Sequence, residues 1–289
     1  MVLGCIAFST AWSKPVLDFD FEGDNLGFSS KGRIKDLPGP IAPEYPGFLK
    51  TNRALGLDGS SWLVIKDPGE ISPLDFENGD SITIETWVLP GPIGEGDNVY
   101  LIGKGRTNNK GFAANNQNYA LRLRGQGGEG CVSFLFFSRS EKDKPGDWHR
   151  WTSDYGVRPE DGWSHVAVAY EFGKPKSVKG YVNGKRVSGK WDMGGATERP
   201  PVVDDDELWI GSALGGSRNN SFAGGLDEVA IHRECLSPEI IAKRHRRVSQ
   251  PKPKFVRDDW PTDKVLVEVV EGFSPARGWP RPALPPVDS

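Results

Sequence analysis

The sequence predicts an all-β fold in which two antiparallel sheets pack face to face, followed by one short helix and a proline-rich tail. Three observations lead to this prediction. Apolar and polar residues alternate with a period of two in many short segments, as strands with one buried face require. The 36 glycines and 23 prolines mark frequent turns. Helix signals occur together in one segment, near residue 237.

The first half of the chain contains the clearest alternation. In residues 81–89, Ile82, Ile84 and Val88 fall on one face and Glu85 falls on the other. Further strands are predicted at residues 15–22, 54–58, 62–65, 99–104, 119–124 and 131–138. We expect residues 54–58 and 62–65 to form a hairpin around the turn residues between them.

The second half continues the pattern. Strands are predicted at residues 149–153, 163–171, 177–187, 207–211 and 226–232. The pair Asn183-Gly184 predicts a two-residue hairpin turn within 177–187. Ser237 and Pro238 are typical of a helix start, so residues 239–248 are expected to be helical. Strands and helices do not alternate, which disfavours a parallel α/β fold.

The ends of the chain differ in composition from the middle. Residues 2–12 are apolar and are too short to span a bilayer, which favours an export signal at residues 1–13 over a buried first strand. Prolines crowd residues 249–289, which indicates a linker or tail leading to a further domain. We therefore expect one domain at 14–248 in a secreted, periplasmic or cell-surface protein that is part of a larger chain.

Charge and cysteine content exclude some classes of function. Lysine and arginine number 36 against 39 acids, a net charge of −3, which disfavours nucleic acid as a partner. The basic residues 243–247 fit the cationic end of a helix. Arg122 and Arg124 alternate with leucines and predict a half-exposed strand.

Cys131 and Cys235 could pair in an oxidising compartment or remain free thiols.

The order of these segments resembles one known family. VLDFDFEGD, ALGLDGSSWLVI and SITIETWVLP are followed by NVYLIGKG, YALRLRG, GWSHVAVAYEFGKPKSVKGYVNGKRV, ELWIGSA and FAGGLDEVAIHRECLSPEIIAKRH. This succession is similar to the laminin-G-like jelly roll of the concanavalin-A-like lectin/glucanase superfamily, from about residue 15 to residue 248. The most specific stretches are 163–184 and 224–240. The long charged loop at 139–147 and the proline-rich tail depart from the pattern.

The resemblance implies a jelly-roll sandwich with six or seven strands in each sheet and with the first and last strands paired. Trp87, Trp163 and Trp209 lie at alternating strand positions, which favours core packing over ligand contact. His165, within WSHVAVAY, corresponds to a structural position of the family. The four histidines show no spacing typical of a transition-metal site.

An enzymatic alternative rests on Asp18, Asp20 and Glu22. Carboxylates at alternate positions of a strand share one face, as in the acidic strand of the superfamily's glucanases, so these three could serve a glycoside hydrolase. The glucanase motif begins with Glu, whereas this chain has Asp18. A solvated strand face is the favoured interpretation.

Calcium is a second expectation from the resemblance. Members of the superfamily often hold a structural Ca²⁺, which takes six to eight oxygen ligands. If the first and last strands are adjacent, Glu22, Asp24, Asp58 and Asp227 could converge around such an ion. The alternative is a set of separate surface acids at turns. The acidic run 204–207 is interpreted as a solvated loop.

The candidate ligand-binding residues are Trp148, Trp151, Tyr155 and Trp191, which fall in or near long loops. Flat aromatic rings there could stack on sugars, or they could pack the flank of the sandwich. The sequence thus predicts a non-catalytic secreted binding or accessory module for a glycan or an extracellular protein, without a membrane span. The alternatives are a glycoside hydrolase and a structural spacer domain.

Overall fold

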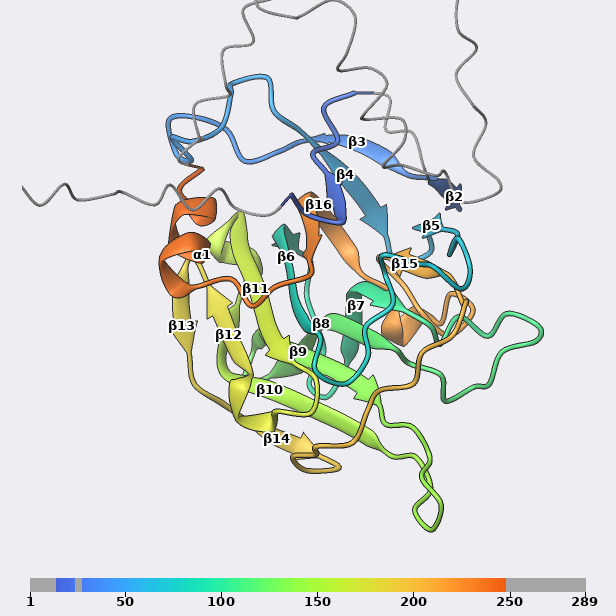
Figure 1. Cartoon of the computed structure of the whole chain (residues 1–289). Helices are drawn as coiled ribbons and strands as arrows, with labels where there is room; N and C mark the ends of the chain where they lie inside the picture. The colour runs from blue at the N-terminus through green and yellow to red at the C-terminus, as the bar shows by residue number, and fades with distance from the viewer. Residues whose placement is uncertain (1–13, 24–27, 248–289) are drawn as a thin grey trace, which may run out of the picture.

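In the computed structural model, which describes residues 14–23 and 28–247, two antiparallel sheets of eight strands each pack face to face (Figure 1). The predicted signal segment, the proline-rich tail and Asp24 lie outside these residues. The sheets are called A and B below. This architecture confirms the predicted jelly-roll sandwich.

Sheet A has its strands in the order β13 (Lys185–Val187), β12 (Lys179–Val182), β11 (Ser164–Glu171), β6 (Ser81–Pro90), β16 (Ala223–His232), β4 (Arg53–Asp58) and β3 (Lys35–Pro38). The eighth strand, β1 (Leu17–Phe19), pairs with β16, as expected for first and last strands. The β12–β13 hairpin confirms the predicted turn, because Asn183 and Gly184 both adopt positive φ, 49° and 72°.

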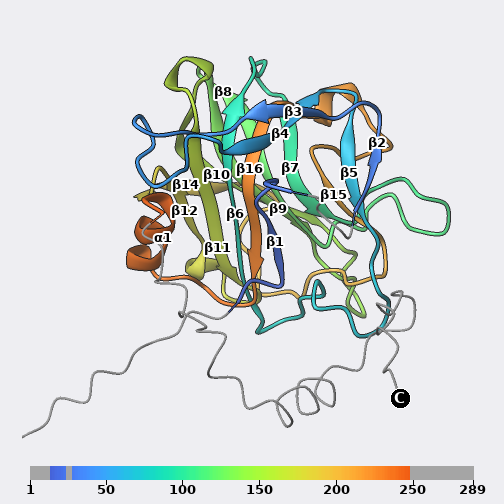
Figure 2. The same ribbon diagram turned by 90° about the horizontal axis from the view of Figure 1, so that it is seen from above.

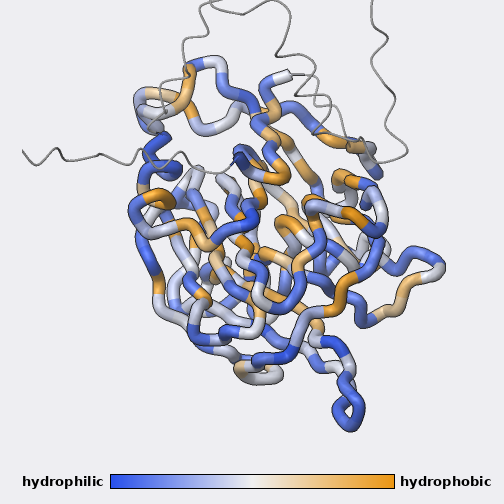
Figure 3. Tube along the Cα trace, in the orientation of Figure 1, coloured by the Kyte–Doolittle hydropathy of each residue, from blue (hydrophilic) through white to orange (hydrophobic). Residues whose placement is uncertain are grey.

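Sheet B runs β14 (Gly189–Met193), β10 (Trp148–Val157), β9 (Glu129–Phe137), β8 (Tyr119–Gln126), β7 (Asn98–Lys104), β15 (Leu208–Ile210), β5 (Trp62–Ile65) and β2 (Ser29–Lys31). Three 3₁₀ turns, η1 (Pro159–Asp161), η2 (Pro175–Ser177) and η3 (Arg218–Asn220), lie in the connections. The loop at 139–147, before β10, is hydrophilic at its tip (Figure 3).

The core lies between the inner faces of the sheets. Ile82, Ile84 and Val88 of β6 are fully buried there, as their alternation predicts. An aromatic cluster joins the two sheets: Phe134 of β9 lies 5.2 Å, centroid to centroid, from Tyr170 of β11. Such burial of large apolar side chains stabilises the sandwich at about 1.5–3 kcal/mol each.

The helix α1 (Pro238–His245) packs on sheet A beside β11 and β12 (Figure 2). The Ser237 hydroxyl accepts a hydrogen bond from the Ile240 amide, which confirms the predicted start, but the helix ends three residues before residue 248. Ile241 packs on Ala167 and Ala169 of β11, whose small side chains leave room for the helix.

A buried carboxylate lies under this helix. The Nε2 atoms of His165 and His232 are 3.1 and 3.0 Å from the Glu85 carboxylate, and Arg244 of α1 forms an ion pair with it. Burial opposes the ionisation of Glu85, but the two histidine hydrogen bonds and the Arg244 charge hold its pKa well below the usual range. His245 stacks on Trp87, 5.3 Å away.

Two expectations about strands were wrong. Residues 54–58 and 62–65 do not form a hairpin: β4 belongs to sheet A and β5 to sheet B, so the turn between them carries the chain from one sheet to the other. Each sheet has eight strands rather than six or seven, because short edge strands such as β2, β3 and β14 are added. All three residues of β2 are exposed, so their sequence lacks the alternation of apolar and polar residues that would predict a strand.

Cys131 and Cys235, the two cysteines of the described residues, are free thiols. Cys131 is on β9 of sheet B, and Cys235 follows β16 of sheet A. Burial raises the pKa of Cys131 to about 11, so this thiol is not activated. Within the described residues, no helix is long and apolar enough to cross a membrane.

Candidate binding groove

A groove of about 530 Å³ lies at one corner of the sandwich, where the chain passes from β13 of sheet A to β14 of sheet B. Its lining residues are Trp151, Pro175, Lys176, Val178, Arg186, Val187, Ser188, Gly189, Lys190 and Trp191. Two of the four aromatic residues predicted to bind a ligand, Trp151 and Trp191, are therefore brought together. They are cross-strand partners on β10 and β14.

Trp151 forms the inner wall of the groove and is only 4% exposed. Its ring lies against Gly180 and Gly189, where an added Cβ would come within 2.5 and 2.3 Å of the ring. Only glycine allows strands to approach the ring this closely. The two glycines thereby fix the position of the indole at the corner.

Trp191 is half-buried beside Trp151. Its indole N–H donates to the Pro175 carbonyl over 3.2 Å, and its ring packs edge-on against Tyr170 and Phe136. These contacts hold the indole in one orientation at the mouth of the groove. A fixed aromatic ring with one side near solvent is suited to stacking on a ligand.

The rim of the groove is cationic. Lys176, Arg186 and Lys190 are exposed, and the lining contains no carboxylate. Within the described part of the chain, none of these three forms an ion pair. The groove thus combines an apolar wall with positively charged donors, although the net charge of the whole chain is −3.

The other two predicted aromatic residues lie elsewhere. Trp148 packs edge-on against Phe137, 5.0 Å away, and the Arg106 guanidinium lies 4.3 Å above its ring. Tyr155 is on the same strand as Trp151 but is 51% exposed and does not line the groove. The structure therefore separates Trp148 and Tyr155 from the pair at the corner.

The acids predicted for a hydrolase do not form a row on one strand. Asp18 is on β1, but the strand ends at Phe19, before Asp20 and Glu22. The Glu22 amide donates to Asp20, and the Glu22 carboxylate accepts from the Arg53 amide. None of the three acids lines the groove.

Arg244 of α1 and Arg247, which follows the helix, lie near the acids at this end. Glu228 of β16 forms an ion pair with Arg247, and Arg244 is also near enough to lower its pKa. Burial, followed by the charges of Asp18 and Asp20, raises the pKa of Glu228 to about 7. The first and last strands do bring Asp18 and Glu228 near each other, and Arg247 pairs with Glu228.

Of the predicted calcium ligands, Asp58 lies at the opposite end of β4 from the partners of Glu22 and Asp227. Glu22 accepts a bond from Arg53 at the start of β4, whereas Asp58 ends that strand and accepts bonds from Ser60 and Ser61. The Ser60 hydroxyl and amide lower the pKa of Asp58 to about 2. Asp227 is buried and accepts from Asn52 over 2.7 Å.

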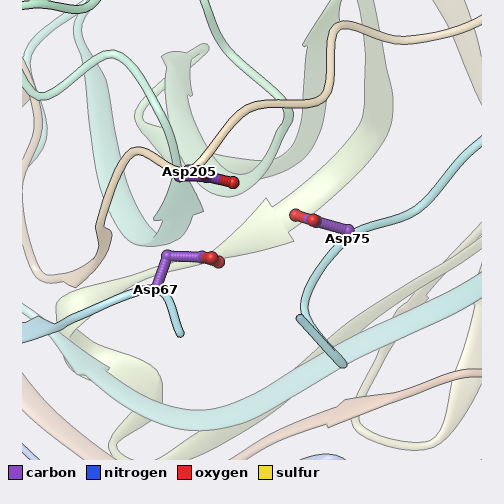
Figure 4. A group of neighbouring side chains, drawn as sticks. All are labelled: Asp67, Asp75 and Asp205. Atoms are coloured by element: carbon purple, nitrogen blue, oxygen red, sulfur yellow. The ribbon is translucent and has the colours of Figure 1, made fainter. Parts of the chain in front are cut away.

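A different acidic group lies at the other end of the sandwich. Carboxylate oxygens of Asp67, Asp75 and Asp205 lie within 4.8 Å of one another and could hold a metal ion (Figure 4). The fully buried Lys104 ammonium is 3.2 Å from Asp67 and 2.7 Å from Asp75. The donors are hard oxygens, which suit Ca²⁺, but two of the three already neutralise Lys104.

Sequence reasoning missed several of these residues. The groove cations are ordinary surface residues in the sequence, and the Asp67–Asp75–Asp205 group joins positions far apart along the chain. In the run 204–207, interpreted as a solvated loop, Asp206 is in fact fully buried and accepts hydrogen bonds from Thr107 and Asn116. Only the pairing of distant strands and loops brings these side chains together.

The family follows from a sequence comparison. A family model described as the concanavalin A-like lectin/glucanases superfamily, of laminin-G type, matches residues 61–242. The chain belongs to this superfamily. The match covers both the groove and the Lys104 region. No curated protein sequence matches the chain.

Solved structures of the superfamily fold resemble the chain. Domain 4 of AbnA, an extracellular arabinanase from Geobacillus stearothermophilus solved with arabinotriose, shares 18% identity at a TM-score of 0.52, covering 80% of this chain and 97% of that domain. The binding domain of Paraclostridial Mosquitocidal Protein 1 shares 15% identity at a TM-score of 0.55, covering 80% of this chain. This chain spans 51% of that toxin domain. At such identities the likeness shows the fold.

Proposed function

We propose that this chain is a non-catalytic glycan-binding module of a secreted or cell-surface protein. The observation that carries the proposal is the corner groove, in which Trp151 and Trp191 are flanked by Lys176, Arg186 and Lys190. Binding sites for small ligands typically combine an apolar wall with a few polar groups that fix orientation. The groove has both.

The chemistry of a sugar fits this lining. The C–H face of a pyranose or furanose ring packs on an indole, and its hydroxyl groups accept hydrogen bonds from ammonium and guanidinium donors. The likeness to an arabinanase domain solved with arabinotriose supports a sugar as the ligand class. The binding domain of the mosquitocidal protein supports a binding role rather than a catalytic one.

Replacing Trp191 tests the proposal. A glycan array probed with the full chain, with and without a chelator, identifies a bound glycan. Titration calorimetry of Trp191→Ala should then show binding weakened by about tenfold or more, the effect typical of a central aromatic contact. Circular dichroism checks that the variant is folded. Trp191→Phe keeps an aromatic ring and should therefore lose less affinity for the glycan than Trp191→Ala.

Tyr155→Ala is the matched control, because Tyr155 is an exposed aromatic residue on the same strand as Trp151 but outside the groove. It should bind the glycan as the unchanged chain does. Equal losses in both variants, or an array with no bound glycan, would contradict the proposal. The second result would favour a spacer or a protein-binding role.

Two parts of the proposal rest on expectation. Calcium stays a prediction: the Asp67–Asp75–Asp205 group offers oxygen ligands, and the chelator arm of the array tests whether binding depends on an ion. Secretion also stays a prediction, supported by the apolar segment 2–12 of the sequence.

A further inference from the structure

The outer face of sheet B carries a group of arginines that the groove does not use. Arg122 and Arg124 of β8, Arg150 of β10 and Arg106 of the loop after β7 make up what we call the arginine face. The strand register places Tyr100 opposite Arg122, and Asn98 opposite Arg124. The four side chains therefore share one side of neighbouring strands.

Contacts among these residues show how close they are. Arg122 lies 5.3 Å from the centre of the Tyr100 ring, and Arg106 donates to the Tyr100 hydroxyl over 2.8 Å. Arg124 and Arg150 both donate to the Asn98 side-chain oxygen, over 3.4 and 3.5 Å. Tyr100 and Asn98 thus connect the arginines in pairs across the face.

Arg122 is the most unusual member because it is buried without a counter-ion. It is only 3% exposed, and no carboxylate in the described residues lies within ion-pair distance of it. It donates to the Ser133 hydroxyl over 3.1 Å and also interacts with the Tyr100 hydroxyl, while its Nε atom is buried without a partner. Burial, with the charges of Arg150 and Arg106, lowers its pKa to about 10, so the guanidinium remains charged at neutral pH.

Charge on the arginine face is unbalanced. Asp192 of β14 is the carboxylate that pairs with it, 2.7 Å from Arg150 and 3.8 Å from Arg124. Arg106 and Arg122 have no ion pair in the described part of the chain, and the Nε atom of Arg106 is also buried without a partner. The face keeps an excess of positive charge next to unused N–H donors.

An unpaired buried charge is costly unless something neutralises it. The planar fork of N–H groups on a guanidinium matches the two oxygens of a carboxylate or sulfate, which it binds bidentately. An oxyanion bound at the partly exposed Arg124 and Arg150 would offset the positive charge of their buried neighbour Arg122. Arg124 and Arg150 are partly exposed, so the face is open to such a ligand.

We infer that the arginine face is a binding site for an oxyanion, namely the carboxylate or sulfate ester group of an acidic sugar. The assignment of this group to a sugar rests on the proposed function. The assignment of a negatively charged ligand rests on Arg122 and its neighbours. The face and the groove meet along one strand, because Trp191 and Asp192 are adjacent residues of β14 with the first in the groove and the second on the face. Adjacent residues of a strand point to opposite sides of its sheet, so the groove and the arginine face are two separate surfaces that meet at β14.

The test measures thermal unfolding of the full chain at constant ionic strength. Low millimolar glucuronate, glucose 6-sulfate and sodium sulfate are compared with glucose, so that general salting-out by sulfate remains small. The two acidic sugars should raise Tm in a saturable way and glucose should not, because ligand bound to the native state alone stabilises it. The two sugars also distinguish carboxylate from sulfate recognition.

Arg122→Met should remove the rise in Tm and weaken the affinity for the acidic sugar by about tenfold or more, as expected for loss of a charged hydrogen-bonding group. Without ligand its Tm should equal or exceed that of the unchanged chain, because a buried unpaired charge has gone. Arg122→Lys, which keeps the charge but not the planar fork, should retain a weakened response. Arg53→Gln, at an exposed pair with Asp36 on sheet A, is the matched control and should respond normally.

Several outcomes would overturn the inference. The inference is rejected if neither acidic sugar produces a saturable rise in Tm. It is also rejected if inorganic sulfate alone raises Tm, because this would indicate an adventitious ion only. A large drop in Tm for Arg122→Met with an unchanged anion response would show that Arg122 serves only to pack on Tyr100. Failure of the groove is distinguishable, because Trp191→Ala would then leave glycan affinity unchanged while Arg122→Met still affects acidic sugars.

Discussion

The two outer faces of the sandwich hold buried charge in opposite ways. On sheet A, the Glu85 carboxylate accepts hydrogen bonds from His165 and His232, pairs with Arg244, and is covered by α1. On sheet B, Arg122 is also buried, but it forms no ion pair within the described residues. The same fold thus carries one satisfied buried charge and one unsatisfied buried charge.

The difference separates structural charge from functional charge. A buried charge whose partners come from the same chain ties elements together, as Glu85 ties β6, β11, β16 and α1. A buried charge without a partner costs stability in the free protein, and this cost is recovered only when a ligand supplies the opposite charge. We call sheet A, whose buried carboxylate is paired within the chain, the closed side; under the proposed function, the outer face of sheet B and the groove between the two sheets are expected to bind the ligand.

Removing Glu85 should have the largest effect on stability. Glu85→Ala leaves the buried histidines and Arg244 without their acceptor, so we expect the free energy of unfolding to fall by about 3–5 kcal/mol. Urea unfolding followed by tryptophan fluorescence measures the loss. Glu70→Ala, at an exposed acid, is the control and should change stability by no more than about 0.5 kcal/mol. A similar small change for Glu85→Ala would remove the contrast between the two faces.

Much of the fold could be predicted because the information is local. The alternation in β6, the Asn183-Gly184 turn and the Ser237 cap each specify their own geometry within a few residues. The β4–β5 hairpin was wrong for the opposite reason. Alternation shows which face of a strand is buried, but not which strand lies beside it, and the short turn after Asp58 joins two different sheets.

The candidate site was only partly visible in the sequence. Trp151 and Trp191 were noticed as aromatic residues near loops, but their meeting depends on the register of β10 with β14. The Leu–Arg alternation of β8 predicted half-exposed arginines, whereas Arg122 is buried beneath its neighbours. A two-residue period gives the side of the sheet and says nothing of what packs on that side.

Lys104 provides a third case, a buried cation that is fully paired. Lys104→Met leaves Asp67 and Asp75 close together without their shared ammonium, so we expect a loss of about 2–4 kcal/mol at neutral pH. The loss should shrink as pH falls toward about 4, because burial raises the pKa of Asp75 and its protonation removes the repulsion between the two carboxylates. Urea unfolding at both pH values measures it.

Comparison with Arg122→Met sharpens the distinction between the two buried cations. Removing the paired lysine should destabilise the protein, while removing the unpaired arginine should not. If both variants lose the same free energy of unfolding, the lack of an ion pair at Arg122 in the described residues does not lower the stability of the protein.

The smallest expected effect concerns Asp227, a buried acid on the closed side. Burial raises its pKa to about 7, even though the hydrogen bond from Asn52 favours the charged form. The folded protein therefore holds this proton up to about pH 7, whereas the unfolded chain loses it near about pH 4. Its contribution to stability is present below about pH 4 and is lost as pH rises through 7.

Asp227→Asn removes this titration while keeping the shape of the side chain. Relative to the unchanged chain, the variant should gain stability between about pH 4 and pH 8, by on the order of 1–3 kcal/mol. Parallel urea titrations across this range measure the difference. A difference that is independent of pH would mean that Asp227 is ionised in the folded protein like an ordinary surface acid. The charge of Arg247 and the hydrogen bond from the Asn52 amide would then be enough to stabilise the charged form of Asp227.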